Sequence, residues 1–190
     1  MKEALFYSLI GFLSGSVLYS WLLPKQLCGV DIVAASDDGN PGTHNAMQLA
    51  GKRVGSLCLL CDLAKGFLPV WIAAQRMDAM SLWFAPVLAA PVLGHVFSPM
   101  LHGRGGKGIA ASFGALLGLL PWNLSLLALA APYVLLSTVV RIRPHAKRSV
   151  VSYLVFAATA LVVNPPSIAL GCLLIAAPVV ARHWPELRSA

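Results

Sequence analysis

The sequence is poor in charged residues. Only 11% of its 190 residues are Asp, Glu, Lys or Arg, and 58% are hydrophobic. An ordinary soluble domain has roughly 25% charged residues, and a soluble chain of this length could not bury so much apolar surface. The composition therefore excludes a soluble domain and predicts an all-α, polytopic integral membrane protein. The length corresponds to one membrane-embedded domain over residues 1–190.

Acidic residues are especially scarce, since 7 Asp and Glu stand against 14 Lys and Arg and the formal net charge is +7. A surplus of cations can indicate a nucleic-acid-binding protein. Here, however, the cations lie in short loops between apolar runs and do not form one polar face. We therefore expect no nucleic-acid partner.

Motifs for metal binding and covalent catalysis are also missing. The four cysteines do not have the spacing of a metal site, and the chain has no His-Glu-x-x-His motif. No set of Ser, His and Asp, or of Cys and His, suggests a covalent acyl-enzyme. We expect neither a metal nor a cofactor. The first apolar run lacks a small-residue cleavage signature, so we interpret it as a retained helix.

What the chain does contain is a series of apolar runs. Seven candidates lie near residues 4–24, 54–74, 79–101, 109–120, 122–140, 150–163 and 167–181. A helix of about 20 residues can cross ~30 Å of hydrocarbon. The fourth, sixth and seventh runs are shorter than that. The sequence therefore predicts about seven transmembrane helices and leaves five as an alternative.

The distribution of cations predicts the orientation. With the N-terminus outside, eleven Lys and Arg lie in the inner loops and the C-terminal segment, and two lie on the outer side. The eleven are Lys25, Lys52, Arg53, Arg104, Lys107, Arg141, Arg143, Lys147, Arg148, Arg182 and Arg188, and the two are Lys2 and Arg76. This asymmetry is the one that the positive-inside tendency predicts. We expect the same loops to face the cytoplasm with either helix count.

A glycine-rich, cationic loop lies between two of the apolar runs. It extends from Gly94 to Gly108 and includes Arg104, Gly105, Gly106 and Lys107. Glycines let backbone N–H groups approach an anion closely, and the helix expected from Ile109 directs its N-terminal dipole at the same place. A Walker A motif is excluded, because Gly108 follows Lys107 where that motif has Ser or Thr. The loop predicts a binding site for a phosphorylated small molecule at the membrane surface.

Two further groups of polar residues lie on the expected inner side. The segment 37–45 is dense in turn formers and hydrogen-bonding side chains, and it is either a binding loop or a solvated turn. Asp62 and Lys65 lie three residues apart within an apolar run, so they share a helix face and can neutralise each other. Both an ion pair for packing and a substrate contact remain open for this pair.

Several short motifs occur in order along the chain. They are Gly15-Ser16, Asp31-Ile32, the loop from Asp38 to Asn45, Asp62-x-x-Lys65-Gly66, Gly94-His95-x-Phe97, Gly105-Gly106-Lys107-Gly108 and Ser149-x-x-Ser152. Together they resemble the bacterial acyl-phosphate:glycerol-3-phosphate acyltransferase family (PlsY). That family has Ser-Gly-Asn-x-Gly-Ala-Thr-Asn in the first loop, and Gly-His-x-Phe followed by Gly-Gly-Lys-Gly later. The resemblance covers most of the chain.

The chain departs from the family pattern at four places. Asp38 stands where the family has Ser, and Thr43 and His44 stand where it has Ala and Thr. Gln48 stands where the family usually has an Arg that looks like a phosphate ligand. The C-terminal His-Arg-x-Asn-Ile signature is reduced to residues 182–186, without its Asn. An added carboxylate and a missing guanidinium both weaken an anion site, so we expect weaker binding of a dianionic acceptor than in relatives with Ser and Arg there.

The resemblance implies a reaction and a set of site residues. A fatty acyl group would move from acyl phosphate to the 1-hydroxyl of glycerol 3-phosphate, giving lysophosphatidic acid for phospholipid synthesis without a covalent acyl-enzyme. The implied catalytic residues are Asn45, His95 and Lys107, although His95 could also be a packing residue. The implied substrate-binding residues are Ser16, Asp38, Gly39, Asn40, Gly42, Thr43, His44, Lys65, Arg104, Gly105, Gly106 and Gly108.

The resemblance also implies partners and a location. The partners are acyl phosphate, glycerol 3-phosphate and the lipid bilayer, and the location is the cytoplasmic membrane of a bacterium. The departures at Asp38 and Gln48 leave a second function open. In that alternative, the protein is a non-catalytic or re-purposed relative that binds or transports a phosphorylated ligand.

Overall fold

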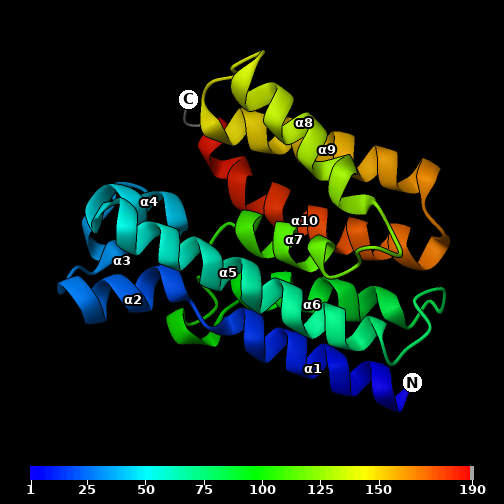
Figure 1. Cartoon of the computed structure of the whole chain (residues 1–190). Coiled ribbons are helices and arrows are strands. Elements are labelled where there is room, and N and C mark those ends of the chain that lie inside the picture. The colour runs from blue at the N-terminus through cyan, green and yellow to red at the C-terminus, as the bar shows by residue number, and fades with distance from the viewer. Residues whose placement is uncertain (189–190) are drawn as a thin grey trace.

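The computed structural model describes residues 1–188, and every regular element in that range is a helix (Figure 1). The longer helices are α1 (Lys2–Ser16), α2 (Tyr19–Cys28), α5 (Gly51–Ala74), α6 (Phe84–Val96), α7 (Ile109–Leu117), α8 (Ser125–Thr138), α9 (His145–Val163) and α10 (Pro166–Arg188). Between them lie α3 (Ile32–Ala35), α4 (Thr43–Leu49) and the 3-10 helix η1 (Pro99–Leu101). The all-α prediction is confirmed.

Each of the seven apolar runs contains a helix, but the helix lengths differ from those expected. Five helical segments are long and apolar enough to cross a membrane, namely Lys2–Cys28, Gly51–Ala74, Phe84–Leu101, His145–Val163 and Pro166–Arg188. The short helices are α7 and α8. The sixth and seventh runs, which looked short, belong to the longer helices α9 and α10, because both continue through polar turns that lie outside the apolar pattern.

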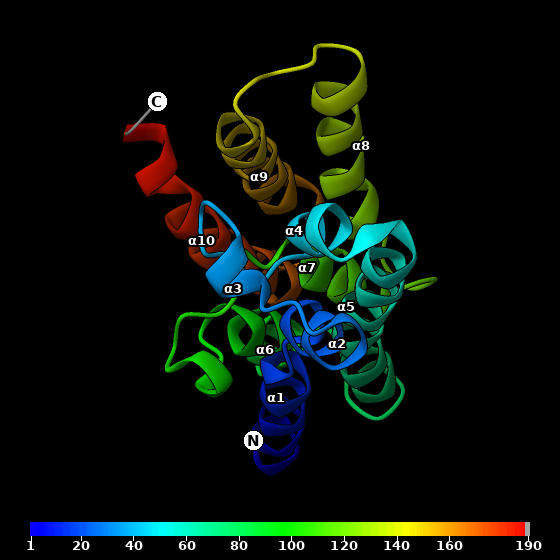
Figure 2. The ribbon, with the colours of Figure 1, turned by 90° about the vertical axis from the view of Figure 1, so that its left-hand side faces the viewer.

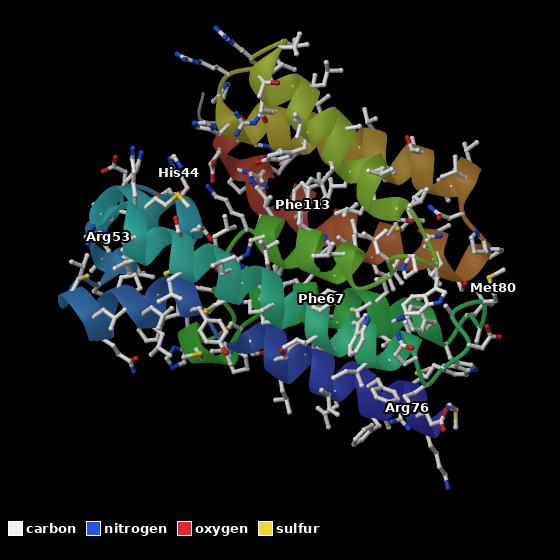
Figure 3. The ribbon with its side chains drawn as sticks, in the orientation of Figure 1. His44, Arg53, Phe67, Arg76, Met80 and Phe113 are labelled. Atoms are coloured by element: carbon white, nitrogen blue, oxygen red, sulfur yellow. The ribbon has the colours of Figure 1, made fainter. Side chains whose placement is uncertain are left out.

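The connections between helices gather at two opposite ends of the bundle (Figure 1). The N-terminus and the connections 75–83 and 118–124 lie on the right in Figure 1. On the left lie α3, α4, the 97–108 loop, the α8–α9 connection and the end of α10, which together we call the loop end. Figure 3 labels Arg53 and Arg76 at opposite ends of α5. The loops that the cation count grouped together therefore share one end of the molecule.

The loop end is covered by the short helices (Figure 2). In this view α3 and α4 lie across the end of the bundle, with α9 and α10 on one side and α2 and α5 on the other. The short helix α3 begins at Asp31, whose carboxylate accepts hydrogen bonds from the N–H groups of Val33 and Ala34. Such a cap satisfies amides that the first turn of a helix leaves unpaired. The polar segment 37–45 is thereby placed over the ends of the long helices.

Glycines bring two pairs of helices into backbone contact. A Cβ atom on Gly15 of α1 would overlap a backbone carbonyl of α6, and one on Gly94 of α6 would overlap a backbone carbonyl of α1. Gly66 and Gly114 bring α5 and α7 together in the same way. Association of helices in lipid depends on such close packing, because lipid tails are as apolar as the helix surfaces. The glycines therefore set the spacing of the helices that carry the polar residues.

We predict that Gly15→Ala destabilises the protein more than Gly11→Ala. Both residues lie in α1, but a Cβ at position 11 would meet side-chain atoms of Ala90 and Pro91 at 3.1–3.3 Å, whereas one at position 15 would overlap the backbone of Pro91. Overpacking of this kind typically costs about 1–3 kcal/mol. The midpoint of thermal unfolding in detergent should fall further for Gly15→Ala than for Gly11→Ala. Equal midpoints for the two variants would contradict this account of the helix contact.

Candidate functional site

A cavity of about 620 Å³ lies inside the loop end. Its polar wall comes from segments far apart in the sequence, and its apolar wall comes from α5, α7 and α8. The polar lining includes Asp38, Asn40, Thr43, His44, Asn45, Asp62, His95, Lys107, His145, Arg148, Ser149, His183 and Glu186, and the apolar lining includes Leu59, Leu63, Ile109, Phe113 and Tyr133. We call it the first cavity. Figure 3 labels His44 near the loop end and Phe113 nearer the middle of the bundle.

The segment 37–45 folds around the carboxylate of Asp38. This carboxylate accepts hydrogen bonds from Asn45 Nδ2 at 2.7 Å and from the N–H of Asn40 at 3.2 Å. Asn45 Nδ2 also donates to the carbonyl oxygen of Asn40, at 2.9 Å. The loop is therefore ordered by its own polar groups and is not a plain solvated turn. Asn45 and Asn40 line the first cavity, as expected, and Asn45 also braces the loop.

Lys107 lies between two carboxylates. Its Nζ is 2.8 Å from Asp38 Oδ2 and 2.6 Å from Glu186 Oε1. Partial burial raises the pKa of Asp38, but hydrogen bonds from Lys107 and Asn45 outweigh it and lower the pKa overall. Burial lowers the pKa of Lys107, but its bonds to Asp38 and Glu186 outweigh burial and raise the pKa overall. Asp38 and Lys107 are therefore both ionised at neutral pH, and together with Glu186 the group has a formal net charge of one negative unit.

The glycines of the cationic loop act in a different way from the one expected. The N–H of Gly105 donates to the carbonyl of Val96 at 3.1 Å, and the N–H of Gly106 donates to the carbonyl of His95 at 3.2 Å. These two amides are thus already bonded inside the protein and do not point at a ligand. Glycine is required there because a Cβ on Gly105 or Gly106 would overlap His95.

The helix dipole expected beyond this loop is in place. Gly108 is the N-cap of α7, with a φ of 86° that favours glycine. Gly108 and Ile109 both line the first cavity. The amides at the start of a helix have no partner within the helix, and they carry partial positive charge. The first turn of α7, with Lys107 beside it, is thus the part of this loop that can face an anion.

Arg182 fastens the glycine-rich loop to α10, a role that the sequence motifs did not reveal. Its Nη2 lies 2.8, 3.2 and 3.1 Å from the carbonyl oxygens of Val96, Gly103 and Gly105. One guanidinium therefore gathers three carbonyls that would otherwise repel each other. Only its place in a shortened C-terminal signature pointed to this residue, because the three acceptors are backbone atoms.

Asp62 and Lys65 form a buried ion pair, with 2.8 Å between Asp62 Oδ1 and Lys65 Nζ. Lys65 Nζ also donates to the carbonyl of Val17, and it lines no cavity. Asp62 Oδ2 accepts from Ser20 Oγ at 2.6 Å and from Thr43 Oγ1 at 3.4 Å. Of the two readings left open, the structure favours packing for Lys65. A role for Lys65 in substrate binding has no support in the geometry.

Two further candidates differ in their surroundings. His95 is 4% exposed, lines the first cavity, and has no hydrogen-bond partner for Nδ1 among residues 1–188. Ser16 lies outside the cavities, and its hydroxyl donates to the carbonyl of Phe12 one turn earlier in α1. Its backbone carbonyl accepts from Ser98 Oγ at 2.6 Å and so ties α1 to the loop after α6. Ser16 therefore connects structural elements, whereas the side chain of His95 is available to a ligand in the first cavity.

A second cavity, of about 1010 Å³, lies on the other side of Lys107. Gly39, Arg104 and Gly105 line it, as do the four residues that it shares with the first cavity, which are Asp38, Asn40, Lys107 and Glu186. Gln48 lines neither cavity. The ion cluster of Asp38, Lys107 and Glu186 thus forms the wall between the two cavities. Gly42 lines the first cavity, and it packs against Asn40.

Comparison with known proteins identifies the family and agrees with the helical membrane fold. The family model described as glycerol-3-phosphate acyltransferase matches residues 5–190. The chain belongs to this family. The crystal structure of PlsY, described as an integral membrane glycerol 3-phosphate acyltransferase in its glycerol 3-phosphate form, superposes with a TM-score of 0.84 at 26% identity. That match covers 97% of this chain and 90% of the other.

Relatives from several bacteria show the same similarity. A glycerol-3-phosphate acyltransferase of Myxococcus xanthus is 42% identical over 135 residues, which are 70% of this chain and 68% of the relative. One from Azotobacter vinelandii is 43% identical over 114 residues, and one from a Hydrogenobaculum species is 36% identical over 114 residues. The aligned segments span 59% and 57% of those two relatives. The protein is thus a multi-pass membrane acyltransferase of this family, and no observation supports the non-catalytic alternative.

We predict that Arg182→Lys loosens the glycine-rich loop. A lysine keeps the charge but cannot reach three carbonyls with one planar group. Hydrogen exchange of the Gly105 amide should become at least about tenfold faster, which corresponds to a loss of about 1.4 kcal/mol. Arg188→Lys is the control, because Arg188 is an exposed residue of the same helix. Unchanged exchange in Arg182→Lys would show that the three contacts do not hold the loop.

Proposed function

We propose that the protein transfers a fatty acyl group from acyl phosphate to the 1-hydroxyl of glycerol 3-phosphate and releases lysophosphatidic acid and phosphate. The observation that carries the proposal is the first cavity, which has ionised and amide groups on one wall and the apolar side chains of α5, α7 and α8 on the other. Such a space suits the two reacting polar headgroups and the beginning of an acyl chain. The crystal structures of the relative PlsY, in glycerol 3-phosphate and lysophosphatidic acid forms, support the choice of acceptor and product.

The proposed reaction needs no covalent intermediate. The oxygen of the 1-hydroxyl bonds to the acyl carbonyl carbon, the bond from that carbon to the phosphate oxygen breaks, and the hydroxyl proton passes to the departing phosphate or to solvent. Phosphate is a good leaving group, so the protein has to bring two anions together and stabilise developing charge. We assign that stabilisation to Lys107 and to the first turn of α7.

The facing wall orients the acceptor. Asn40, Thr43 and Asn45 line the same cavity as Lys107 and offer amide and hydroxyl groups to an alcohol. His95 is buried at the base of the glycine-rich loop, where it can hold a hydroxyl or exchange a proton. Because Lys107 is already paired with two carboxylates, we expect a dianionic acceptor to bind more weakly than in relatives with Ser in place of Asp38.

Two substitutions with opposite expected effects test this assignment. Lys107→Ala removes the cation, and we expect kcat/KM to fall about 100- to 1000-fold, as for loss of a preorganised oxyanion donor. Asp38→Ser removes one competing carboxylate, and we expect KM for glycerol 3-phosphate to fall about tenfold, or about 1.4 kcal/mol. The measurement is lysophosphatidic acid formed by the purified protein from acyl phosphate, scored by mass.

Asp37→Ser is the matched control, because Asp37 is an exposed neighbour and forms no ion pair among residues 1–188. A folded Lys107→Ala protein with normal turnover would remove Lys107 from the site. A rise in KM for Asp38→Ser would give Asp38 a positive role in holding the acceptor. Absence of the product with the unmodified protein would refute the proposed reaction.

We also propose that the loop end faces the cytoplasm of a bacterium, with the N-terminus outside. The surplus of cations at the loop end supports this orientation. In a Cys28→Ser background, a cysteine introduced at Arg76 should react with an impermeant thiol reagent on intact cells, and one at Arg104 should not. Both native side chains are exposed and lie at opposite ends. Strong labelling at position 104 alone would reverse the orientation.

A further inference from the structure

The formal charges around the first cavity are unevenly matched. Asp62 is paired with Lys65, and Lys107 is paired with both Asp38 and Glu186, so that this group is net negative. Arg148 also lines the cavity. Among residues 1–188 its guanidinium has no carboxylate within 4.0 Å, and its buried Nε has no hydrogen-bond partner. We call the side of the cavity formed by His145, Arg148 and Ser149 of α9 the α9 wall. The unmatched positive charge of the cavity is therefore on the α9 wall.

Two histidines lie beside this cation. The rings of His44 and His145 are 5.5 Å apart, centre to centre, and both line the first cavity. His44 comes from α4 and His145 from the first turn of α9, one turn before Ser149, which also lines the cavity. The guanidinium of Arg148 lies 5.4 Å from the ring centre of Tyr133, which fixes it from the side of α8. The three cationic or protonatable groups thus converge from two segments.

We propose that Arg148, with His44 and His145, forms a phosphoryl-binding subsite on the α9 wall of the first cavity. A phosphoryl group carries close to two negative charges and several acceptor oxygens, and a guanidinium can bind two of these oxygens at once. Next to Lys107, such a group would also meet the carboxylates of Asp38 and Glu186. On the α9 wall it meets a cation that no carboxylate of residues 1–188 neutralises.

This inference rests on the proposed function for the identity of the ligand. Both substrates of the proposed reaction carry a phosphoryl group, and the chemistry of the subsite suits either one. A phosphoryl group of the acceptor would leave its alcohol facing Asn40 and Asn45. That of the donor would leave its acyl chain against Phe113 and Tyr133. The test therefore includes both ligands.

The test measures binding to the purified full chain in detergent, without turnover, by titration calorimetry. The ligands are glycerol 3-phosphate, glycerol as the uncharged control, and a non-hydrolysable acyl phosphonate. Arg148→Gln should weaken one of the two phosphorus-containing ligands at least tenfold. Lys147→Gln is the matched control, because it removes the same charge from the neighbouring, exposed position of α9, and it should change binding less than twofold.

Two further variants keep the result interpretable. Arg148→Lys retains the charge, so it should recover part of the binding even if Arg148→Gln is less stable. His44→Thr should weaken the same ligand that Arg148→Gln weakens. Loss for glycerol 3-phosphate assigns the subsite to the acceptor, and loss for the acyl phosphonate assigns it to the donor. If both ligands bind folded Arg148→Gln as they bind the unmodified protein, the subsite does not exist.

Failure of the subsite can be told apart from failure of the proposed function. If the unmodified protein forms no lysophosphatidic acid but binds a phosphorus-containing ligand through Arg148, the subsite is supported and the proposed reaction is refuted. If the protein forms the product and Arg148→Gln leaves both ligand binding and KM unchanged, the proposed reaction is supported and the subsite is refuted.

Discussion

The arrangement of the loop end depends on the buried pair of Asp62 and Lys65. A charge inside a membrane protein is costly unless it is paired or hydrogen-bonded. Lys65 meets this requirement by bonding the carbonyl of Val17 at the break between α1 and α2, and Asp62 does so by bonding Ser20 and Thr43. One pair in α5 therefore fixes the entry to α2 and the start of α4. Removing either partner would leave a buried charge uncompensated.

The position of α4 in turn decides where the polar loop can reach. Thr43 begins α4, and Asn45 in its first turn bonds the carboxylate of Asp38. That carboxylate lies against Lys107, which follows the glycine-rich loop. Arg182 of α10 fastens this loop from the opposite side. Segments that are more than 60 residues apart in the chain are thus connected by side chains from α5, α4 and α10, and each connection satisfies a polar group that lipid could not.

The charges of the site are distributed in a way that separates this chain from the family pattern. Asp38 and Glu186 neutralise Lys107 and make it part of the wall between two cavities. The α9 wall keeps the unmatched cation. A phosphoryl group in this cavity would be attracted more strongly by the α9 wall than by the neutralised Lys107. The effect is large because electrostatic interactions in a partly buried site are screened less than at an exposed surface. Under the proposed function, the preference for an acceptor or a donor depends on residues from both walls.

The sequence by itself determined the class of protein, the family and the order of the motifs. Apolar runs separated by loops require helices in lipid, because only helices satisfy their own backbone within one segment. It also identified Asp38, Asn45, His95 and Lys107 as neighbours through the family motifs, and the structure places all four on one cavity. It could not give the lengths of α9 and α10, whose polar turns do not continue the apolar pattern.

Only the tertiary structure decided what individual polar groups do. The amides of Gly105 and Gly106 were expected to bind phosphate, but their partners are the carbonyls of Val96 and His95, nine and eleven residues earlier in the chain. For Lys65 both an ion pair and a substrate contact were open, and its partners are Asp62 of the same helix and the carbonyl of Val17, just after α1. Arg182 lies only in a shortened signature and Arg148 lies in no motif, yet Arg182 holds the glycine-rich loop and Arg148 lines the first cavity. The physical reason is that a motif records which residues are present, whereas the bond that each donor makes depends on acceptors brought close by the packing of other helices.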